Sequence, residues 1–182
     1  WRFRCCWWSH WPLSHKADMS ELPLLALSVR QPWAWAIIHG GKVIENRSLG
    51  SIKAGRMTTG RICLHAASGM KEEEYRYAHW RLAQHGVTCP RPDMLVRGGI
   101  IGTVDVTGII TSSDSEWFSG SAGLTLANPE AIDPVPARGA LGYFEWHRAV
   151  SLAPVKPWMK RFDRSNGDDQ TLALFPDTGP SY

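Results

Sequence analysis

The segment GGKVIENR, residues 40–47, says more about the fold than any other part of the chain. Its paired glycines end a predicted helix at 33–38, because glycine tolerates the left-handed conformation found at helix ends. Residues 42–47 then predict a strand. Alternation along that strand places Glu45 and Arg47 on one face, so they form either a structural ion pair or part of a ligand site.

The remaining pattern predicts a mixed β domain with inserted helices. The expected strands cover residues 24–29, 61–66, 100–110, 124–127 and 141–146, with a turn-rich segment at 128–139. The clearest helix is 71–85, with Ser68 as its cap and Gly86 at its end. The alternation through 100–110 is interrupted by glycines, which predicts a long bent strand suited to a small closed barrel.

Composition narrows the class of protein. A chain of 182 residues, 43% hydrophobic and 20% charged, matches one globular domain. No apolar run reaches the roughly 18 residues needed to cross a bilayer, so no membrane span is expected. The 4 cysteines form no C-x-x-C pair, so the sequence predicts no metal site, no cofactor and no disulfide framework. This cysteine usage fits a reducing, cytoplasmic location.

Both ends are expected to lie outside the folded domain, which we place at residues 19–164. Residues 1–18 carry tryptophans without helical or strand periodicity. They are interpreted as a non-native or disordered extension, with a tryptophan-mediated binding tail as the alternative. Residues 165–182 predict a loose tail. Three basic residues and one acidic residue in 1–18 supply +2 of the net charge of +3, so any nucleic-acid site must be a local cluster.

Three segments, residues 27–34, 40–47 and 60–67, together resemble the opening of an ASCH domain. The family signature G-x-K-x-x-E-x-R is matched in full from Gly40 onward, and later segments extend the resemblance over residues 24–146. The resemblance implies a small PUA-like β-barrel with two main α-helices and a ligand cleft between the first helix and the barrel. It also implies binding of RNA or of another nucleic acid or nucleotide.

Side chains in and near the signature suit such a ligand. Lysine and arginine hold phosphates through charge-assisted hydrogen bonds, and aromatic rings stack on unpaired bases. The residues expected to bind are Arg30, Gln31, Trp33, Trp35, Lys42, Glu45, Asn46, Arg47, His65 and Arg138. Lys42 can reach the cleft if it lies in the turn after Gly41, as we expect. The structural alternatives are core packing for a tryptophan and a hydrogen-bonded strand position for His65. The expected partner is single-stranded RNA, DNA or a modified nucleoside, bound by a monomer.

The main alternative is a metal-independent hydrolase using the same cleft. ASCH-like amidohydrolases acting on N-acetylated cytidine use a lysine base and a threonine three positions later, where this chain has Glu45. An amidase would therefore need Glu45 to activate water and Lys42 to stabilise the oxyanion. A ribonuclease would use Lys42 as base, with Arg47 and His65 assisting. A third alternative is a protein-interaction role for the helix at 71–85.

Overall fold

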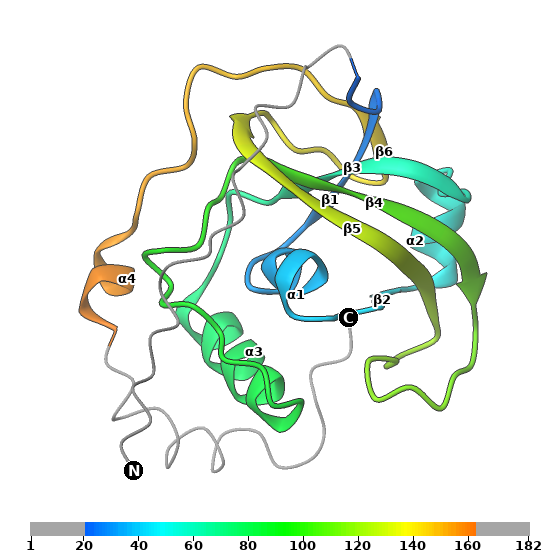
Figure 1. The fold of residues 1–182 in the computed structure, drawn as a ribbon, viewed down its shortest axis with the longest axis horizontal. Helices are drawn as coiled ribbons and strands as arrows, with labels where there is room; N and C mark the ends of the chain where they lie inside the picture. The colour runs from blue at the N-terminus through cyan, green and yellow to red at the C-terminus, as the bar shows by residue number, and fades with distance from the viewer. Residues whose placement is uncertain (1–20, 163–182) are drawn as a thin grey trace, which may run out of the picture.

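One six-stranded sheet organises residues 21–162, the part of the chain that the computed structural model describes (Figure 1). The strands are β1 (Leu25–Val29), β2 (Ile44–Arg47), β3 (Gly60–Ala66), β4 (Gly99–Ile110), β5 (Ala122–Pro136) and β6 (Tyr143–Glu145). Their order is β2-β5-β4-β3-β1-β6, with β1 and β3 parallel. The extensions predicted at 1–18 and 165–182 lie outside the described residues.

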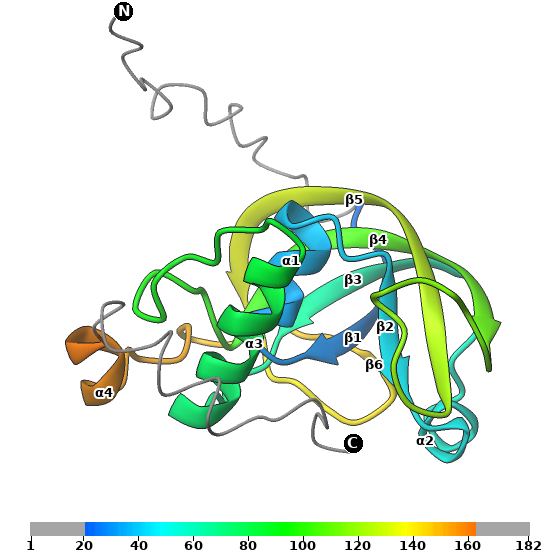
Figure 2. The same ribbon diagram turned by 90° about the horizontal axis from the view of Figure 1, so that it is seen from below.

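Four helices accompany the strands within residues 21–162: α1 (Trp33–His39), α2 (Leu49–Ala54), α3 (Glu72–Gln84) and α4 (Pro157–Arg161). The first of them contacts β3 and β5 and lies between the strands and α3 in the view of Figure 1. Figure 2 shows β5 arching over α1. The sheet therefore curls into a half-barrel, which confirms the predicted mixed β fold with inserted helices.

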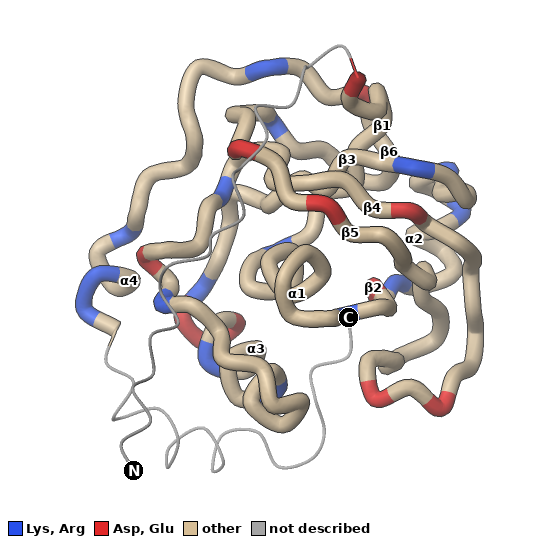
Figure 3. Tube along the Cα trace, in the orientation of Figure 1, with Lys and Arg blue, Asp and Glu red and all other residues tan. Residues whose placement is uncertain are grey.

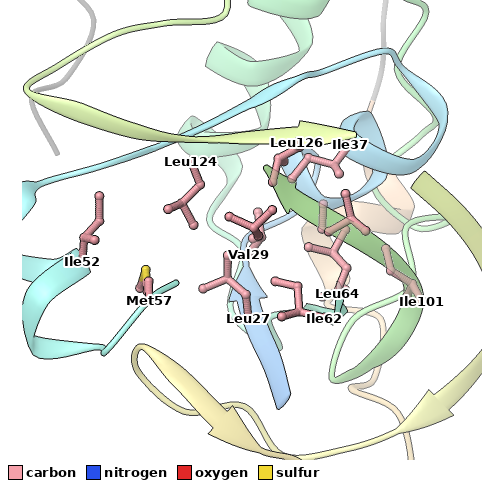
Figure 4. Packing of buried hydrophobic residues seen from close by; sticks show 14 of the residues in the cluster. Leu27, Val29, Ile37, Ile52, Met57, Ile62, Leu64, Ile101, Leu124 and Leu126 are labelled. Carbon is pink, nitrogen blue, oxygen red and sulfur yellow. The ribbon is translucent and has the colours of Figure 1, made fainter. Parts of the chain in front are cut away.

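The main hydrophobic core fills the inside of this curl. Figure 4 shows Leu27 of β1, Leu64 of β3 and Leu124 of β5 meeting there, and Ile37 of α1 joins them. A second cluster packs α1 against α3 and α4. A seven-residue helix is too short to be stable alone. Burial of an isoleucine side chain contributes about 1.5–3 kcal/mol, so α1 depends on the two clusters it joins.

The two edge strands, β2 and β6, do not pair with each other, and other contacts bridge them. On the β2 side, Arg47 Nη2 donates to the carbonyl of Ser28 in β1 at 2.7 Å. On the β6 side, the amide of Tyr143 donates to the carbonyl of Gly55, just after α2, at 3.0 Å. A Cβ on Gly55 would lie 2.6 Å from the Cα of Gly142, so these two chain segments pack backbone to backbone.

Three local predictions were wrong. Residues 128–139 were expected to be turns, yet β5 continues through Pro136. Pro129 and Pro134 are tolerated because they fall where the register of β5 against β4 shifts, and because β2 pairs only with 122–125. The N-cap position of α3 is held by Lys71, not Ser68, and the amide of Lys71 donates to the Glu74 side chain. The short helices α2 and α4 were not predicted, although Ser48 accepts a capping hydrogen bond from the amide of Ser51.

Replacing Gly142 with alanine tests the backbone contact that bridges the open edges. Gly142 has φ +72° and Gly86 has φ +70°, so alanine is strained equally at both. A Cβ at Gly142 would overlap Gly55, whereas one at Gly86 meets open space. We expect Gly142→Ala to lower the free energy of unfolding by about 1–3 kcal/mol more than Gly86→Ala does, measured by urea denaturation. Equal losses would contradict this packing.

Candidate functional site

The charged residues of the signature form a continuous chain of contacts. Lys42 lies in the turn between α1 and β2, as expected, and its side chain is only 5% exposed. Its Nζ donates to Glu45 Oε2 at 3.0 Å and also to the carbonyl of Ile44. The same ammonium group lies 5.9 Å from the centroid of the Trp33 ring. The positive charge of Lys42 is therefore held inside the protein by its own neighbours.

Arg47 extends this series of contacts from β2 to β1. Its Nε lies 3.4 Å from Glu45 Oε1, so the predicted pair of Glu45 and Arg47 is observed. Its Nη2 bonds the carbonyl of Ser28. Each oxygen of Glu45 thus faces a different cation, and the carboxylate links the turn before β2 to β1 through Arg47. A buried ion needs such partners because its transfer from water into the protein costs a free energy of several kcal/mol.

Two amide side chains of the predicted site hold other parts of the chain. Asn46 Nδ2 donates to the carbonyl of Trp117, and its Oδ1 accepts from the amide of Ser119, each at 2.9 Å. Gln31 is 2% exposed, donates to the carbonyl of Val96 at 2.7 Å and accepts from the amide of Trp35 at 3.0 Å. Asn46 therefore anchors the loop between β4 and β5, and Gln31 anchors α1.

The two tryptophans expected to stack on bases are both partly buried. Trp33 packs against the two larger core clusters and meets Tyr77 of α3 edge-on, with centroids 6.4 Å apart. Trp35 packs against the second core cluster, and its ring lies 5.8 Å from that of His39. The structure thus gives both rings packing partners.

An open pocket of about 310 Å³ lies where β1 and β3 end. It is lined by Ser28, Arg30, His65, Ala67, Ser68, Gly69, Gly139, Ala140 and Leu141. No residue of α1 lines this pocket, so it is not the cleft between helix and barrel that the family resemblance implies. Of the residues expected to bind, Arg30 and His65 line it. Arg47 adjoins it through Ser28.

A hydrogen-bonded pair forms the back of the pocket. Ser28 and His65 are register partners on the parallel strands β1 and β3, and Ser28 Oγ lies 2.9 Å from His65 Nδ1. His65 Nε2 lies 3.1 Å from the carbonyl of Ala137. A carbonyl only accepts, so Nε2 carries the proton and Nδ1 of the neutral ring accepts from the Ser28 hydroxyl. Burial lowers the pKa of His65 below its ordinary value.

Positive charge lies both at the rim and behind the wall of the pocket. Arg30, with a side chain 58% exposed, pairs with Glu74 of α3. Arg97 is 3% exposed and donates to the carbonyls of Ser68, at 2.6 Å, and Pro154. Burial lowers the pKa of Arg97 from its ordinary value, but an arginine stays charged. Arg138 is exposed beside Gly139.

Figure 3 shows how uneven the charge is elsewhere. Acidic positions follow β4, β5 and the loop between them, whereas α4 carries basic ones. On the strands, Arg61 pairs with Asp105 and Glu130. The cation on this part of the strands is therefore paired with carboxylates.

Sequence reasoning missed Ser28 and Gly139, which line this pocket, and Arg97, which lies behind its wall. Ser28 lies in the segment 27–34, but its partner His65 is 37 residues away in the sequence, so no local pattern indicates the pair. Gly139 has no side chain, and a Cβ there would lie 2.6 Å from His65 Cε1. No sequence pattern pointed to Arg97, because it donates to backbone carbonyls, which every residue carries. Among residues 21–162 no cluster of three or more metal-ligating side chains occurs, and no helix there is long and apolar enough to cross a membrane.

The curled six-stranded sheet with its inserted helices makes residues 21–162 a small mixed β domain of half-barrel shape. The ASCH domain family model matches residues 27–157, so the chain belongs to the ASCH domain family. A mutant form of ZmASCH from Zymomonas mobilis is 15% identical, with a TM-score of 0.34, covering 75% of this chain and 91% of that one. No curated protein matches the chain. Family membership is consistent with RNA binding in general.

Glu45→Gln tests whether the buried ion pairs hold the fold. The change keeps the shape of Glu45 but leaves the buried ammonium of Lys42 without its anion, which should cost about 3–5 kcal/mol of unfolding free energy. Glu130→Gln is the matched control: its carboxylate pairs with Arg61 but is 71% exposed, so the cost should stay below about 1 kcal/mol. Equal costs in urea denaturation would exclude a structural role for the Glu45 pairs.

Stability should fall in mild acid because His65 is buried in its neutral form. Its pKa is lower in the folded chain than the ordinary value of 6.5, so the unfolded chain binds more protons between the two values. Stability is therefore present above about pH 6.5 and decreases as pH falls below it. His65→Gln should lose less stability than the unsubstituted protein between about pH 7.5 and about pH 5.5, compared in urea. The same loss in both would contradict this assignment.

Proposed function

We propose that this ASCH domain binds single-stranded RNA or another nucleic-acid-derived ligand, and that a phosphate of the ligand sits at the mouth of the pocket beside Arg30. The observation that carries the proposal is an open pocket with an exposed guanidinium at its rim. Arginine can present two donors to one phosphate, and charge-assisted hydrogen bonds are the stronger ones. Glu74 pairs with Arg30 in the structure, and a bound phosphate would replace Glu74 as the partner of Arg30.

Arg97 and Arg138 support an anionic ligand at this position. Arg97 is bound by carbonyls, which carry no net charge, so its own charge remains uncompensated directly behind Ser68. Buried charge of this kind is screened less by salt than exposed charge is. Arg138 is an exposed cation that directly precedes Gly139, a residue of the pocket lining. Together they give the pocket a positive potential that the acidic face of β4 and β5 lacks.

The non-ionic part of the ligand would lie on the apolar wall of the pocket. Ala67, Ala140 and Leu141 line it, and Leu141 is 97% exposed. A fully exposed leucine beside a pocket offers apolar surface that a base or a sugar can cover. Ser28 and Ser68 add polar groups at the same site. The pocket can therefore hold one nucleoside while Arg30 holds its phosphate.

In this proposal the signature residues Lys42, Glu45 and Arg47 position the pocket. Lys42 could contact a ligand only after breaking its bond to Glu45, and its low exposure opposes that. Arg47 fixes the carbonyl of Ser28 and thereby the end of β1. The hydrolase that would use Lys42 and Glu45 gains no support here, because both Glu45 oxygens already face cations.

The test measures how binding depends on Arg30. Arg30→Gln should weaken binding of a labelled single-stranded RNA about tenfold in fluorescence anisotropy, as expected for one lost charge-assisted contact. The slope of log K against log salt should fall by about 0.7. Glu74→Gln should bind at least as tightly as the unsubstituted domain, because it frees Arg30 and keeps an acceptor for the amide of Lys71.

Arg61→Gln is the matched control for the loss of one positive charge. Arg61 also lies on the surface with acidic partners, but it is at the opposite end of β3 from His65 and does not line the pocket. An equal loss of affinity in Arg30→Gln and Arg61→Gln would mean that RNA binds through general charge. Unchanged binding in Arg30→Gln would exclude this pocket as the phosphate site.

A further inference from the structure

The strongest unassigned feature is the hydroxyl of Ser28 at the back of the pocket. It is 2.9 Å from a histidine nitrogen that can only accept, because the other ring nitrogen donates to the carbonyl of Ala137. A serine bonded to an oriented base is the arrangement that makes a hydroxyl nucleophilic. We propose that Ser28 is a nucleophile, with His65 as its general base, that cleaves carboxylic esters bound in this pocket.

Three properties of the site support a reactive pair. The strands fix the two side chains, because Ser28 and His65 are register partners on a parallel ladder. The pocket is open to solvent and lined by both residues, so a substrate carbonyl can reach the hydroxyl. Gly139 leaves space that a Cβ would fill, because that Cβ would lie 2.9 Å from both Ser28 Oγ and His65 Nδ1.

The state of His65 also suits a base. Burial lowers its pKa, so the ring is neutral at neutral pH and its Nδ1 is free to take a proton. The carbonyl of Ala137 holds the opposite N–H and would stabilise the imidazolium that forms. This resembles the way in which an acceptor orients the histidine of a serine hydrolase, with a carbonyl replacing the carboxylate.

The reaction balances with ester and water as the only reactants. Ser28 Oγ attacks the acyl carbon while its proton passes to His65 Nδ1. The bond from the acyl carbon to the alkoxy oxygen then breaks, and the leaving alcohol takes that proton. Water attacks the acyl-serine and gives a proton to Nδ1, which returns it to Ser28 Oγ as the carboxylic acid leaves. His65 keeps its Nε2 proton throughout.

The lining of the pocket indicates the class of ester. Ala67, Ala140 and Leu141 provide apolar surface for a short acyl chain, and Arg30 provides a cation for an anionic group on the alcohol. The fitting substrate is a short-chain ester of a phosphate-bearing alcohol. This inference uses the pocket of the proposed function but does not depend on RNA binding, so each can fail alone.

The test is covalent labelling of the full chain with an alkyl fluorophosphonate, which phosphonylates activated serines. We expect one adduct, located on Ser28 by peptide mass spectrometry and absent from Ser28→Ala. His65→Gln keeps a hydrogen-bond acceptor but cannot take the proton, so labelling should slow about 100-fold. Ser112→Ala is the matched control, because Ser112 is an exposed serine in the loop between β4 and β5 that does not line the pocket, and it should leave the labelling of Ser28 unchanged.

Circular dichroism melts of each variant check that it is folded, and 4-nitrophenyl acetate gives a second readout. The folded protein should release a burst of nitrophenolate equal to its own concentration, and Ser28→Ala should release none. The proposal is overturned if the unsubstituted protein takes up no label, or if label or burst survives in Ser28→Ala. It is also overturned if folded His65→Gln labels at the normal rate. Labelling with no RNA binding would refute the proposed function alone.

Discussion

The chain of charges from Lys42 through Glu45 to Arg47 is the interaction on which the rest of the structure depends. The sheet does not close by hydrogen bonds between its own edges, so β2 needs another connection to the far side of the curl. Arg47 supplies it by reaching the carbonyl of Ser28, and Glu45 holds Arg47 in place. Each ion is tolerable inside the protein because the next one neutralises it. The signature residues therefore connect β2 to the far side of the curled sheet.

That constraint also separates the signature from the pocket. Cations that compensate a buried carboxylate are poor ligands for a phosphate, because binding would break an existing pair. In the proposed function the charge that meets the ligand comes instead from Arg30 at the rim and from Arg97, whose acceptors are neutral carbonyls. The signature nevertheless affects the pocket, because Arg47 fixes the backbone of Ser28, whose hydroxyl contacts His65.

Much of the fold could be predicted because its signals are local. The helix after Pro32 and the strand from Ile44 follow from periodicity and from the glycines between them. The error in β5 has a physical cause: Pro129 and Pro134 indicate turns, but both fall at irregular points of the pairing with β4 and beyond the residues that pair with β2, so no ladder hydrogen bond needs their N–H groups. Whether a strand has one neighbour or two is a property of the sheet, so no local pattern reveals it.

The sequence by itself determined the family and the order of most elements, and it offered the pair of Glu45 and Arg47 as one of two alternatives, because alternation puts residues two apart on one face of a strand. The pairing of Lys42 with Glu45 was not predicted. Tertiary structure alone decided the pocket. Ser28 meets His65 across 37 residues, and His65 meets Ala137 across 72, through the strand ladder and the return of the chain after β5. Such contacts depend on register, which is fixed only when the whole core has packed.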